Sequence, residues 1–393
     1  MGKPNKRGPL AGIRVIEMAA LGPVPFSGML LADLGAEVIR IERAGSPAPG
    51  LPMDPRFDII SRGRRSISLD LKSPAGIELA LKLIATADVL MEGMRPGAME
   101  RLGLGPDVCL ARKPALIYGR MTGWGQSGPL AQSAGHDINY LSMNGVLHAI
   151  GLEGGPPVPP INLVGDYGGG SMFLVTGLLA ALVEARTSGQ GQVIDAAMLE
   201  GSSYLLTTIH MFTGAGMWQA ERGTNLLDSG APFYCVYATA DNKYMAVGAI
   251  EPKFYREFVA GLDLDINSLP SPMDRTAWHS LKQTFTDAFS TRTRREWTEI
   301  FSVRDACVTP VLSIEESLAH EHNSQRQNFV TLNGITQPNL APRFSRTDSR
   351  VTATATVPGA QGRHILEELG LSEQQIADFA RQGVVLLEEN GQS

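Results

Sequence analysis

The fold is decided by the stretch GIRVIEMAALGPVPFSGMLLADLGAEVIRIER, residues 12–43. Apolar residues fill Ile13–Met18, a helical pattern runs from Phe26 to Leu34, and Glu37–Glu42 alternates as a strand does. A strand, a helix and a second strand in this order predict a βαβ unit with parallel strands. The turn after the first strand, Ala19–Pro25, lacks the pattern G-x-G-x-x-G, so nicotinamide and flavin dinucleotides are disfavoured as ligands.

The residues that follow this unit repeat its alternation of strand and helix. Ser66–Leu71 is expected to be a strand, and Ser73-Pro74 is expected to start a helix that runs to about Ala87. Asp88–Glu92 and Ala115–Met121 are expected to be further strands. We therefore expect an α/β fold with a Rossmann-like large domain.

The pattern changes beyond two irregular connectors, residues 151–160 and about 215–232. Phe233–Ala240 and Lys243–Ile250 predict a hairpin around Asp241-Asn242. Helices are expected from Lys253, Thr276, Thr293 and Ser313, the last two with capping boxes completed by Glu296 and Glu316. These elements predict a smaller α+β domain. From about residue 330 the chain is rich in Pro, Ser and Thr, and His364–Leu387 is expected to form an amphipathic helical segment.

The composition limits the classes of protein and partner. The chain has 393 residues, of which 43% are hydrophobic and 19% charged, as in ordinary globular proteins, and its net charge is −6. This charge argues against bulk binding of nucleic acid or anionic membranes, although a local basic pocket can still hold an anion. The apolar run Phe173–Val183 is short for a bilayer span and is expected to be a buried helix. Cys109, Cys235 and Cys307 stand far apart, which disfavours disulfides and thiolate metal sites, and without a secretory signal pattern we expect a cytoplasmic protein.

Three residues at the ends of predicted elements are candidates for acid–base chemistry. His136 starts a predicted amphipathic helix that runs toward Ile150, where it could accept a proton or simply help to cap that helix. Asp166 precedes three glycines and a long predicted helix, so it could be an N-cap or an acid–base group beside backbone that a ligand can approach closely. Glu251, just before Pro252, is the third candidate, although taken alone this position favours a solvated turn residue.

Basic residues gather at the ends of strands and helices of the first domain, where a phosphate group would be received. Most surface arginines are merely solvated, so this cluster alone is a weak indication of a ligand. Its members are Arg40, Arg43, Arg62, Arg64, Arg65, Lys72, Arg95 and Arg101. The sequence contains no Walker A motif, no G-x-S-x-G and no H-E-x-x-H, which disfavours kinase, serine hydrolase and metallohydrolase activities.

Longer segments of the chain carry a close family resemblance. They include GPLAGIRVIE at 8–17, LLADLGAEVIRIER at 30–43, RSISLDLKSPAG at 65–76 and RPGAMERLGLGP at 95–106. They continue with MTGWGQSGP, AGHDINYLSMNG, NLVGDYGGGSMF, GQGQVIDAAMLEG and APRFSRT, and end with ILEELGLSEQQIADFARQGVV. Over nearly its whole length the sequence resembles the family III CoA transferases and, among them, the α-methylacyl-CoA racemases.

The resemblance implies an interlocked homodimer that binds CoA. In each subunit, residues 1–215 and 330–393 would form the Rossmann-like large domain, and 216–329 the small domain with its linkers. The active site would lie between the large domain of one subunit and the small domain of the other. The residues that match the CoA-holding segments are Arg43, Leu69, Asp70, Leu71, Lys72, Gly93, Met94, Arg95, Arg101, Gly135, Asp137, Ile138, Asn139 and Tyr140.

The resemblance is compatible with two reactions. Transferases of the family use the aspartate that matches Asp166 as a nucleophile and cover it with a glycine-rich loop of the small domain. Here the corresponding stretch, Ala246–Pro252, has no glycine run and carries Glu251. Together with the pair His136-Asp137, this favours a racemase of lipid metabolism, and a CoA transferase is the alternative.

Inversion at the carbon α to a thioester requires acid–base groups on both faces of that carbon. We expect His136 to remove the proton from one epimer and Asp166 from the other, while Glu251 supports His136 by a hydrogen bond. Backbone N–H groups beside Asp166, at its helix start, are the expected donors to the enolate oxygen. No metal or redox cofactor is needed, because CoA is part of the substrate. Sterol side chains, branched fatty acids and arylpropionyl groups all stay open as the acyl chain.

Overall fold

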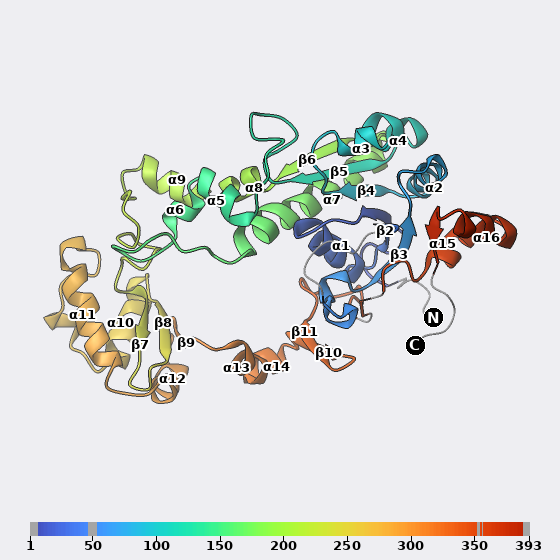
Figure 1. Ribbon diagram of the computed structural model, residues 1–393. Coiled ribbons are helices and arrows are strands. Elements are labelled where there is room, and N and C mark those ends of the chain that lie inside the picture. The colour runs from blue at the N-terminus through green and yellow to red at the C-terminus, as the bar shows by residue number, and fades with distance from the viewer. Residues whose placement is uncertain (1–6, 46–52, 352–353, 356, 388–393) are drawn as a thin grey trace. The chain divides into compact units, whose positions relative to one another are not determined.

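The structure is a computed structural model that describes residues 7–45, 53–351, 354–355 and 357–387 (Figure 1). By their contacts these residues divide into two compact units. Unit 1 contains the described residues of 7–144, 161–205 and 324–387, and unit 2 contains 145–160 and 206–323. The predicted domains have other limits, because they assign 145–160 and 206–215 to the large domain and 324–329 to the small one.

Seven strands form one sheet in unit 1 (Figure 1). In chain order they are β1 (Arg14–Met18), β2 (Glu37–Arg43), β3 (Arg64–Leu69), β4 (Val89–Glu92), β5 (Ile117–Thr122), β6 (Val193–Ala197) and β12 (Val385–Leu386). Their order across the sheet is β12-β3-β2-β1-β4-β5-β6, with β12 antiparallel to β3 and all other neighbours parallel. The parallel part has the strand order 3-2-1-4-5-6 of a Rossmann-type sheet, which confirms the predicted α/β class.

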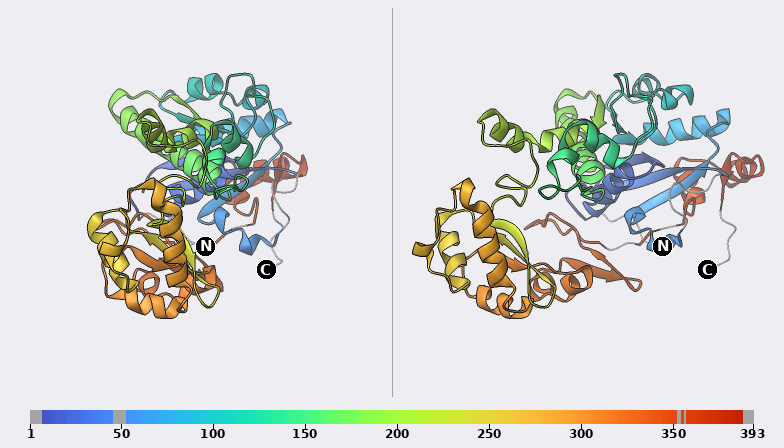
Figure 2. Two further views of the ribbon diagram at one scale, coloured as in Figure 1. Left: turned by 90° about the vertical axis from the view of Figure 1, so that its left-hand side faces the viewer. Right: turned by 60° about the vertical axis from the view of Figure 1, so that its left-hand side comes forward.

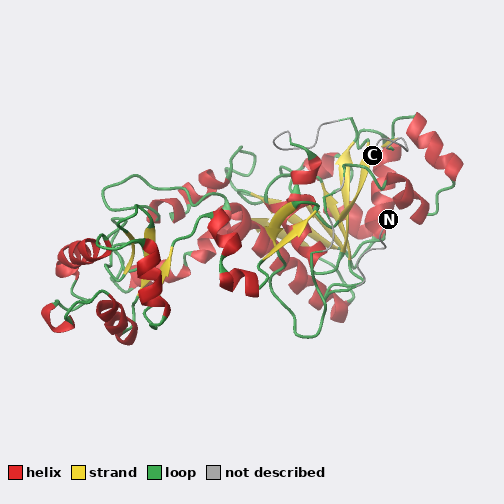
Figure 3. Cartoon of the chain, turned by 90° about the horizontal axis from the view of Figure 1, so that it is seen from below, coloured by secondary structure: helices red, strands yellow, loops and turns green. Residues whose placement is uncertain are grey.

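Helices cover both faces of this sheet (Figure 3). They are α1 (Pro23–Asp33), α2 (Pro74–Ala85), α3 (Ala98–Arg101), α4 (Pro106–Arg112), α5 (Asp137–Met143), α7 (Met172–Ser188), α8 (Met198–Leu205), α15 (Gly362–Glu368) and α16 (Glu373–Arg381). Because successive strand residues point to opposite faces, neighbours in one strand join different cores. Ile16 and Leu90 pack in the cluster that includes α2 and α15, whereas Val15 and Val89 pack with α1 and α7.

The predicted unit at residues 12–43 is confirmed as β1, α1 and β2. Helix α1 begins at Pro23 rather than at Phe26, because proline is well accommodated in the first turn of a helix. The same rule holds at α2, where Ser73 is the N-cap and Pro74 the first helical residue.

Unit 2 contains a three-stranded antiparallel sheet covered by helices (Figure 2). The strands are β7 (Tyr234–Ala238), β8 (Tyr244–Gly248) and β9 (Val308–Pro310). The helices are α6 (Val146–Ala149), α9 (Thr207–Gly214), α10 (Pro252–Gly261), α11 (Trp278–Phe289), α12 (Arg294–Ser302) and α13 (Ile314–Ala319). Helix α14 (Glu321–Gln325) begins in unit 2 and ends in unit 1. The predicted hairpin is confirmed as β7 and β8, with Asn242 at φ 55° in the turn. Both predicted capping boxes form, Thr293 with Glu296 and Ser313 with Glu316.

The helix that carries the glycine run is longer than predicted. A π-helical stretch, η3 (Leu163–Ser171), continues directly into α7 and gives a helical segment of 26 residues, Leu163–Ser188. By length and composition this segment could cross a membrane, so the prediction that it is too short is wrong. Leu174, Val175 and Leu178 pack in the core against the sheet, as side chains of a core helix do.

Candidate active site

The carboxyl ends of the parallel strands lie along one edge of the sheet, where ligands bind in folds of this kind. The strand order reverses between β1 and β4, and the loops after these two strands meet there. A Cβ built on Gly93, after β4, would lie 3.1 Å from the Cβ of Ala20, after β1. A Cβ built on Gly22 would lie 3.2 Å from Oδ2 of Asp166. Asp166 is therefore placed at the switch point of the sheet.

Asp166 lies inside the π-helical stretch η3, whose N-cap is Asn162, so Asp166 is not an N-cap. Its backbone N–H donates to Oδ2 of Asp137 at 2.8 Å, and the N–H of Tyr167 donates to the carbonyl of Asn162 at 3.3 Å. The first of these N–H groups is thus taken by a side chain of α5, and the second by the backbone of the helical segment that begins at Leu163. These two N–H groups therefore already have partners, and the assignment of enolate donors beside Asp166 stays a prediction. Insertions of π-helix occur frequently at functional sites.

Burial raises the pKa of the Asp166 carboxyl, and the negative charge of Asp137 raises that pKa further. Two groups lower it: the Asn162 side-chain amide, whose Nδ2 donates to Oδ2 of Asp166 at 3.5 Å, and the positive charge of His136. A carboxyl with a raised pKa holds its proton nearer to neutral pH, which suits a group that must both donate and accept. The effect of His136 also indicates that the two candidate groups lie within electrostatic reach of each other.

His136 occupies the N-cap position of α5, and its side chain is exposed. The backbone N–H of His136 donates to Oδ1 of Asn139 at 3.0 Å. The next residue, Asp137, is buried, and burial raises the pKa of its carboxyl. Because Asp137 accepts the N–H of Asp166, it joins the start of α5 to η3 and brings the two candidate segments together. The predicted extension of this helix toward Ile150 is wrong, since α5 ends at Met143.

The loop before His136 is pinned to the end of β5. The hydroxyl of Tyr140 donates to the carbonyl of Gly135 at 2.5 Å, and its ring meets Trp124 edge to face at 4.8 Å between centroids. A Cβ built on Gly123 would lie 2.0 Å from the ring of Tyr140, so only glycine fits there. Tyr140 thus fixes the loop from inside, and its predicted contact with CoA stays a prediction.

Four of the eight basic residues are exposed near the carboxyl edge. Arg43 ends β2, Lys72 follows β3, Arg95 follows β4, and Arg101 ends α3. A Cβ built on Gly97 would lie 3.1 Å from a terminal guanidinium nitrogen of Arg101, so this side chain lies over the turn that follows β4. These four cations are placed where the phosphates of a nucleotide-like ligand could be received.

The other four basic residues pair with carboxylates inside the fold. The expectation that Arg40, Arg62, Arg64 and Arg65 belong to a phosphate site is wrong, because each meets an acidic side chain within unit 1. Their partners are, in the same order, Glu42, Asp33, Glu17 and Glu37, at 2.9, 2.6, 2.6 and 2.6 Å.

The remaining predicted CoA residues differ in exposure. Leu69 and Leu71 are buried in the core, whereas Gly93 and Ile138 are exposed. Asp70 shapes its own turn, since its Oδ1 accepts the N–H of residue 72 at 3.0 Å. Contact of any of these residues with CoA stays a prediction.

Three residues of this region, Glu92, Arg120 and Asn162, are not among the residues predicted from the sequence. Glu92, at the end of β4, is fully buried and accepts the N–H of Met94 at 2.6 Å and Nε of Arg120 at 3.0 Å. Burial raises the pKa of Glu92 to about 7. Arg120 also donates to Glu100 on α3 at 2.7 Å, so the pair braces the turn that presents Arg95 and Arg101. Their positions near the ends of predicted strands are a usable signal, as is the spacing of Asn162 one helical turn before Asp166.

Glu251 belongs to unit 2, where it is the exposed N-cap residue of α10 after strand β8. This is the turn position that the sequence predicts. Its hydrogen bond with His136 of unit 1 stays a prediction.

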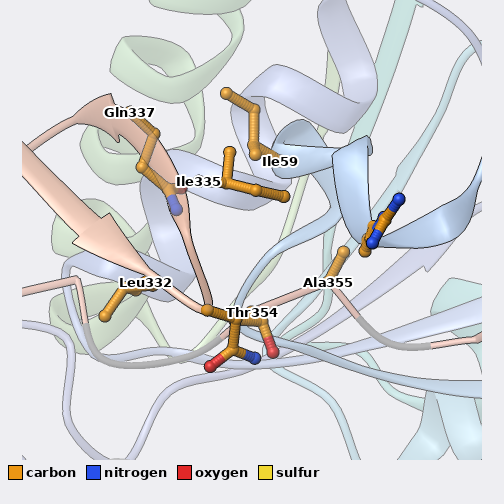
Figure 4. A pocket seen from close by; sticks show the side chains of 8 residues that line it. Ile59, Leu332, Ile335, Gln337, Thr354 and Ala355 are labelled. Carbon is orange, nitrogen blue, oxygen red and sulfur yellow. The ribbon is translucent and has the colours of Figure 1, made fainter.

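A separate hollow in unit 1 contains none of the acid–base candidates (Figure 4). It lies between the 3-10 turns η1 (Pro55–Phe57) and η2 (Ile59–Ser61) and the hairpin of β10 (Phe329–Leu332) and β11 (Ile335–Pro338). Its lining residues are Arg56, Ile59, Leu332, Asn333, Ile335, Gln337, Thr354 and Ala355. In the part of the chain that the structure describes, no group of three His, Cys, Asp or Glu residues is arranged to hold a metal ion.

Comparison with known proteins connects this arrangement to one family. Residues 10–364 match the family described as CoA-transferase family III. The chain is 45% identical over 380 residues to the protein of Mus musculus named alpha-methylacyl-CoA racemase. The aligned residues cover 96% of this chain and 97% of that protein. The chain is 44% identical over 372 residues to the Homo sapiens protein of the same name, covering 93% and 95%. Its fold is similar to the crystal structure of a CAIB/BAIF family protein from Brucella suis, with a TM-score of 0.79 and 23% identity over 92% of this chain and 100% of that chain.

Proposed function

Because the chain belongs to CoA-transferase family III, we propose that it is a racemase that inverts the 2-methyl stereocentre of 2-methylacyl-CoA thioesters. The two named relatives that match it over more than nine-tenths of its length support this activity. The structural observation that carries the proposal is the hydrogen bond from the N–H of Asp166 to Asp137, because it joins the His136 and Asp166 segments beside the switch point of the sheet.

The reaction is a transfer of one proton off C2 and one proton onto C2. In one direction the imidazole of His136 takes the C2 proton, and the electron pair of the C–H bond passes into an enolate conjugated with the thioester. Protonated Asp166 then gives its proton to the opposite face of C2. In the other direction Asp166 is the base and the imidazolium of His136 is the acid. Glu251 would accept a hydrogen bond from His136 and hold the ring in position.

The two acid–base groups suffice for the proton transfers, so the proposal requires no metal or redox cofactor, and CoA acts as part of the substrate. We assign the phosphates of CoA to the exposed cations Arg43, Lys72, Arg95 and Arg101 at the carboxyl edge. Charge-assisted bonds from these groups hold the thioester in place, and binding energy from the CoA moiety is available to position C2 between the two acid–base groups.

We further propose that the active protein is an interlocked homodimer in the cytoplasm. Unit 1 carries His136 and Asp166 while unit 2 carries Glu251. In the proposed dimer, the large domain of one subunit meets the small domain of the other, so that the site takes Glu251 from the second copy. The proposed reaction involves no nucleic acid and no membrane.

The alternative function is CoA transfer between carboxylic acids, with Asp166 as the nucleophile. The family assignment and the half-buried carboxylate of Asp166 are compatible with it. The stretch Ala246–Pro252 speaks against it, because its single glycine cannot form a glycine-rich cover.

One incubation distinguishes these functions. A pure (2R)-2-methylacyl-CoA is incubated with the protein in deuterated water, with and without an added carboxylic acid. We expect deuterium at C2 and growth of the (2S) epimer in both samples. CoA appearing on the added acid, without exchange at C2, would establish the transferase instead, and binding without either reaction would identify a CoA-binding scaffold.

A further inference from the structure

We propose that helix α8 is a platform that sets the separation of Asp166 and His136, and that Gly201 and Ser202 are its positioning residues. The inference rests on the proposed function, since it concerns how the two acid–base groups of that reaction are held apart. Neither residue is one of the proposed acid–base groups, and both act through the segments that carry those groups.

The contact of α8 with η3 is backbone against backbone. A Cβ built on Gly201 would lie 1.8 Å from the carbonyl oxygen of Gly169. A Cβ built on Gly169 would lie 2.5 Å from the backbone nitrogen of Ser202. No side chain can yield to relieve either overlap, so the two glycines fix how closely η3, and Asp166 within it, can lie to α8.

The contact of α8 with α5 is made by hydrogen bonds. Asn144 is the C-cap residue of α5, and its Nδ2 donates to Oγ of Ser202 at 2.6 Å and to the carbonyl of Leu199 at 3.0 Å. Ser202 is fully buried, and its Oγ donates in turn to the carbonyl of Met198 at 2.6 Å. The helix whose N-cap is His136 is thus attached at its far end to the same turn of α8 that packs on η3.

The platform itself is anchored in the sheet. Helix α8 follows β6 without a connecting loop, and the N–H of Leu199 donates to the carbonyl of Gly123 at 3.0 Å, in the turn after β5. Two neighbouring strands therefore fix its first turn. A displacement of about 1 Å in a reacting group can cost on the order of 100-fold in rate, so a rigid common support has a direct catalytic consequence.

The test uses two substitutions, each with a matched control in the same unit. Gly201→Ala places a Cβ 1.8 Å from the Gly169 carbonyl oxygen, whereas Gly177→Ala places one 3.1 Å from a methyl group of Ile194, so its overlap is far smaller. Ser202→Ala removes one of the two acceptors of Asn144, whereas Ser203→Ala removes a hydroxyl that donates to the carbonyl of Leu199 in its own helix. CoA binding, measured by calorimetry, reports whether each variant keeps its fold.

The readout separates inversion at C2 from deuterium uptake with retained configuration, starting from each epimer in deuterated water. Inversion needs both acid–base groups, but uptake with retention needs only the group on the face of the departing proton. For Gly201→Ala we expect inversion to fall on the order of 100-fold while one epimer, the one that His136 deprotonates, still exchanges with retention. Ser202→Ala should displace His136 instead. Inversion should then fall, while the epimer that Asp166 deprotonates should still take up deuterium with retention.

The remaining outcomes of this experiment either support or overturn the role of α8. If Gly201→Ala does not fold, Ser202→Ala and Ser203→Ala carry the test alone. The inference is overturned if the two test variants invert C2 at the same rates as their controls. It is also overturned if a variant loses deuterium exchange equally from both epimers. If the unsubstituted protein neither inverts nor exchanges C2, the proposed function fails rather than the platform.

Discussion

At the residue scale, the behaviour of the site depends on Asp166 and on the charge next to it. Burial and the carboxylate of Asp137 raise the pKa of Asp166, and the amide of Asn162 opposes them. Asp137→Asn keeps an oxygen that can accept the N–H of Asp166 but removes the like charge. We therefore expect the limb of the kcat pH profile that reports Asp166 to move to lower pH.

The matched control for that substitution is Asp107→Asn, at an exposed position on α4. The pH profile of this variant should coincide with that of the unsubstituted protein. A limb that stays in place in Asp137→Asn, or moves to higher pH, would refute the electrostatic coupling of the two carboxyls.

The exposed cations give a second prediction at this scale. Arg101→Ala removes a guanidinium that is assigned to the phosphates of CoA, and a charge-assisted bond contributes about 1.5 to 3 kcal/mol. We expect KM to rise about tenfold or more while kcat is nearly unchanged, because the bond is made equally in the ground and transition states. Arg112→Ala is the control, since Arg112 is exposed on α4 and paired with Glu78 at 2.8 Å. An unchanged KM in Arg101→Ala would exclude Arg101 from the CoA site.

Individual site residues are only partly predictable from the sequence. His136 and Asp166 stand out because chemistry-bearing side chains at element ends reach the edge of a parallel sheet. The sequence does not show that Arg64 forms an ion pair with Glu17, because the pair joins β3 to β1 across β2, between residues 47 positions apart. Such pairing depends on the spatial order of strands, which the chain order does not reveal.

At the element scale, that same pair gives a prediction about stability. Glu17 is fully buried and the side chain of Arg64 is 1% exposed, with 2.6 Å between Nε and Oε2. Glu17→Gln leaves a buried guanidinium without its counter-charge, and breaking a buried pair in this way costs about 3 to 5 kcal/mol. We expect the midpoint of urea unfolding, followed by circular dichroism, to fall accordingly.

The control is Glu78→Gln, which breaks the exposed pair with Arg112. Exposed pairs contribute about 1 kcal/mol or less, so this variant should unfold close to the unsubstituted protein. Equal midpoints for Glu17→Gln and Glu78→Gln would contradict a structural role for the buried pair.

Regular elements follow from local patterns, and the exceptions have local causes. The unit β1–α1–β2, the β7–β8 hairpin and the two capping boxes are predicted because period and cap residues suffice to define them. The π-helical stretch η3 is not predicted, because the run Gly168-Gly169-Gly170 is read as the end of a loop. Close packing of Gly169 on Gly201 holds these residues in a helix despite their low propensity, and only the folded structure supplies that contact.

At the scale of the whole molecule, the proposed dimer can be tested by combining defective subunits. In purified heterodimers, one arrangement puts His136→Ala in one subunit and Glu251→Ala in the other. If each site takes Glu251 from the second subunit, one site then loses both groups and the other stays intact. We expect about half the activity of the unsubstituted dimer.

The second arrangement puts both substitutions in one subunit and pairs it with an unsubstituted one. In an interlocked dimer each site then lacks one group, so we expect almost no activity. The reverse result, activity in the second arrangement and none in the first, would place each complete site within a single subunit. A monomer by light scattering would exclude the dimer altogether.

The architecture illustrates what chain order leaves open. Alternation of strands and helices predicts a parallel sheet, but the order 3-2-1-4-5-6 and the return of β12 to β3 are set by long-range packing. His364–Leu387 is predicted as a helical segment, and the structure forms α15 and α16 but ends in β12, because Val385 and Leu386 pair with Leu69 and Ser68. Such pairing depends on the free edge of β3, which no local pattern shows.

The central claim is that two different groups exchange protons with opposite faces of C2. It is tested most directly by the early products of one pure 2-methylacyl-CoA epimer in deuterated water. At low conversion, chiral separation and mass spectrometry give the deuterium content of the new epimer and of the recovered substrate. We predict that the new epimer carries solvent deuterium at C2, because the proton it receives comes from the second group, while the recovered substrate retains mostly protium. A new epimer that keeps the original protium would contradict the account, since a single group would then have moved that proton from one face to the other.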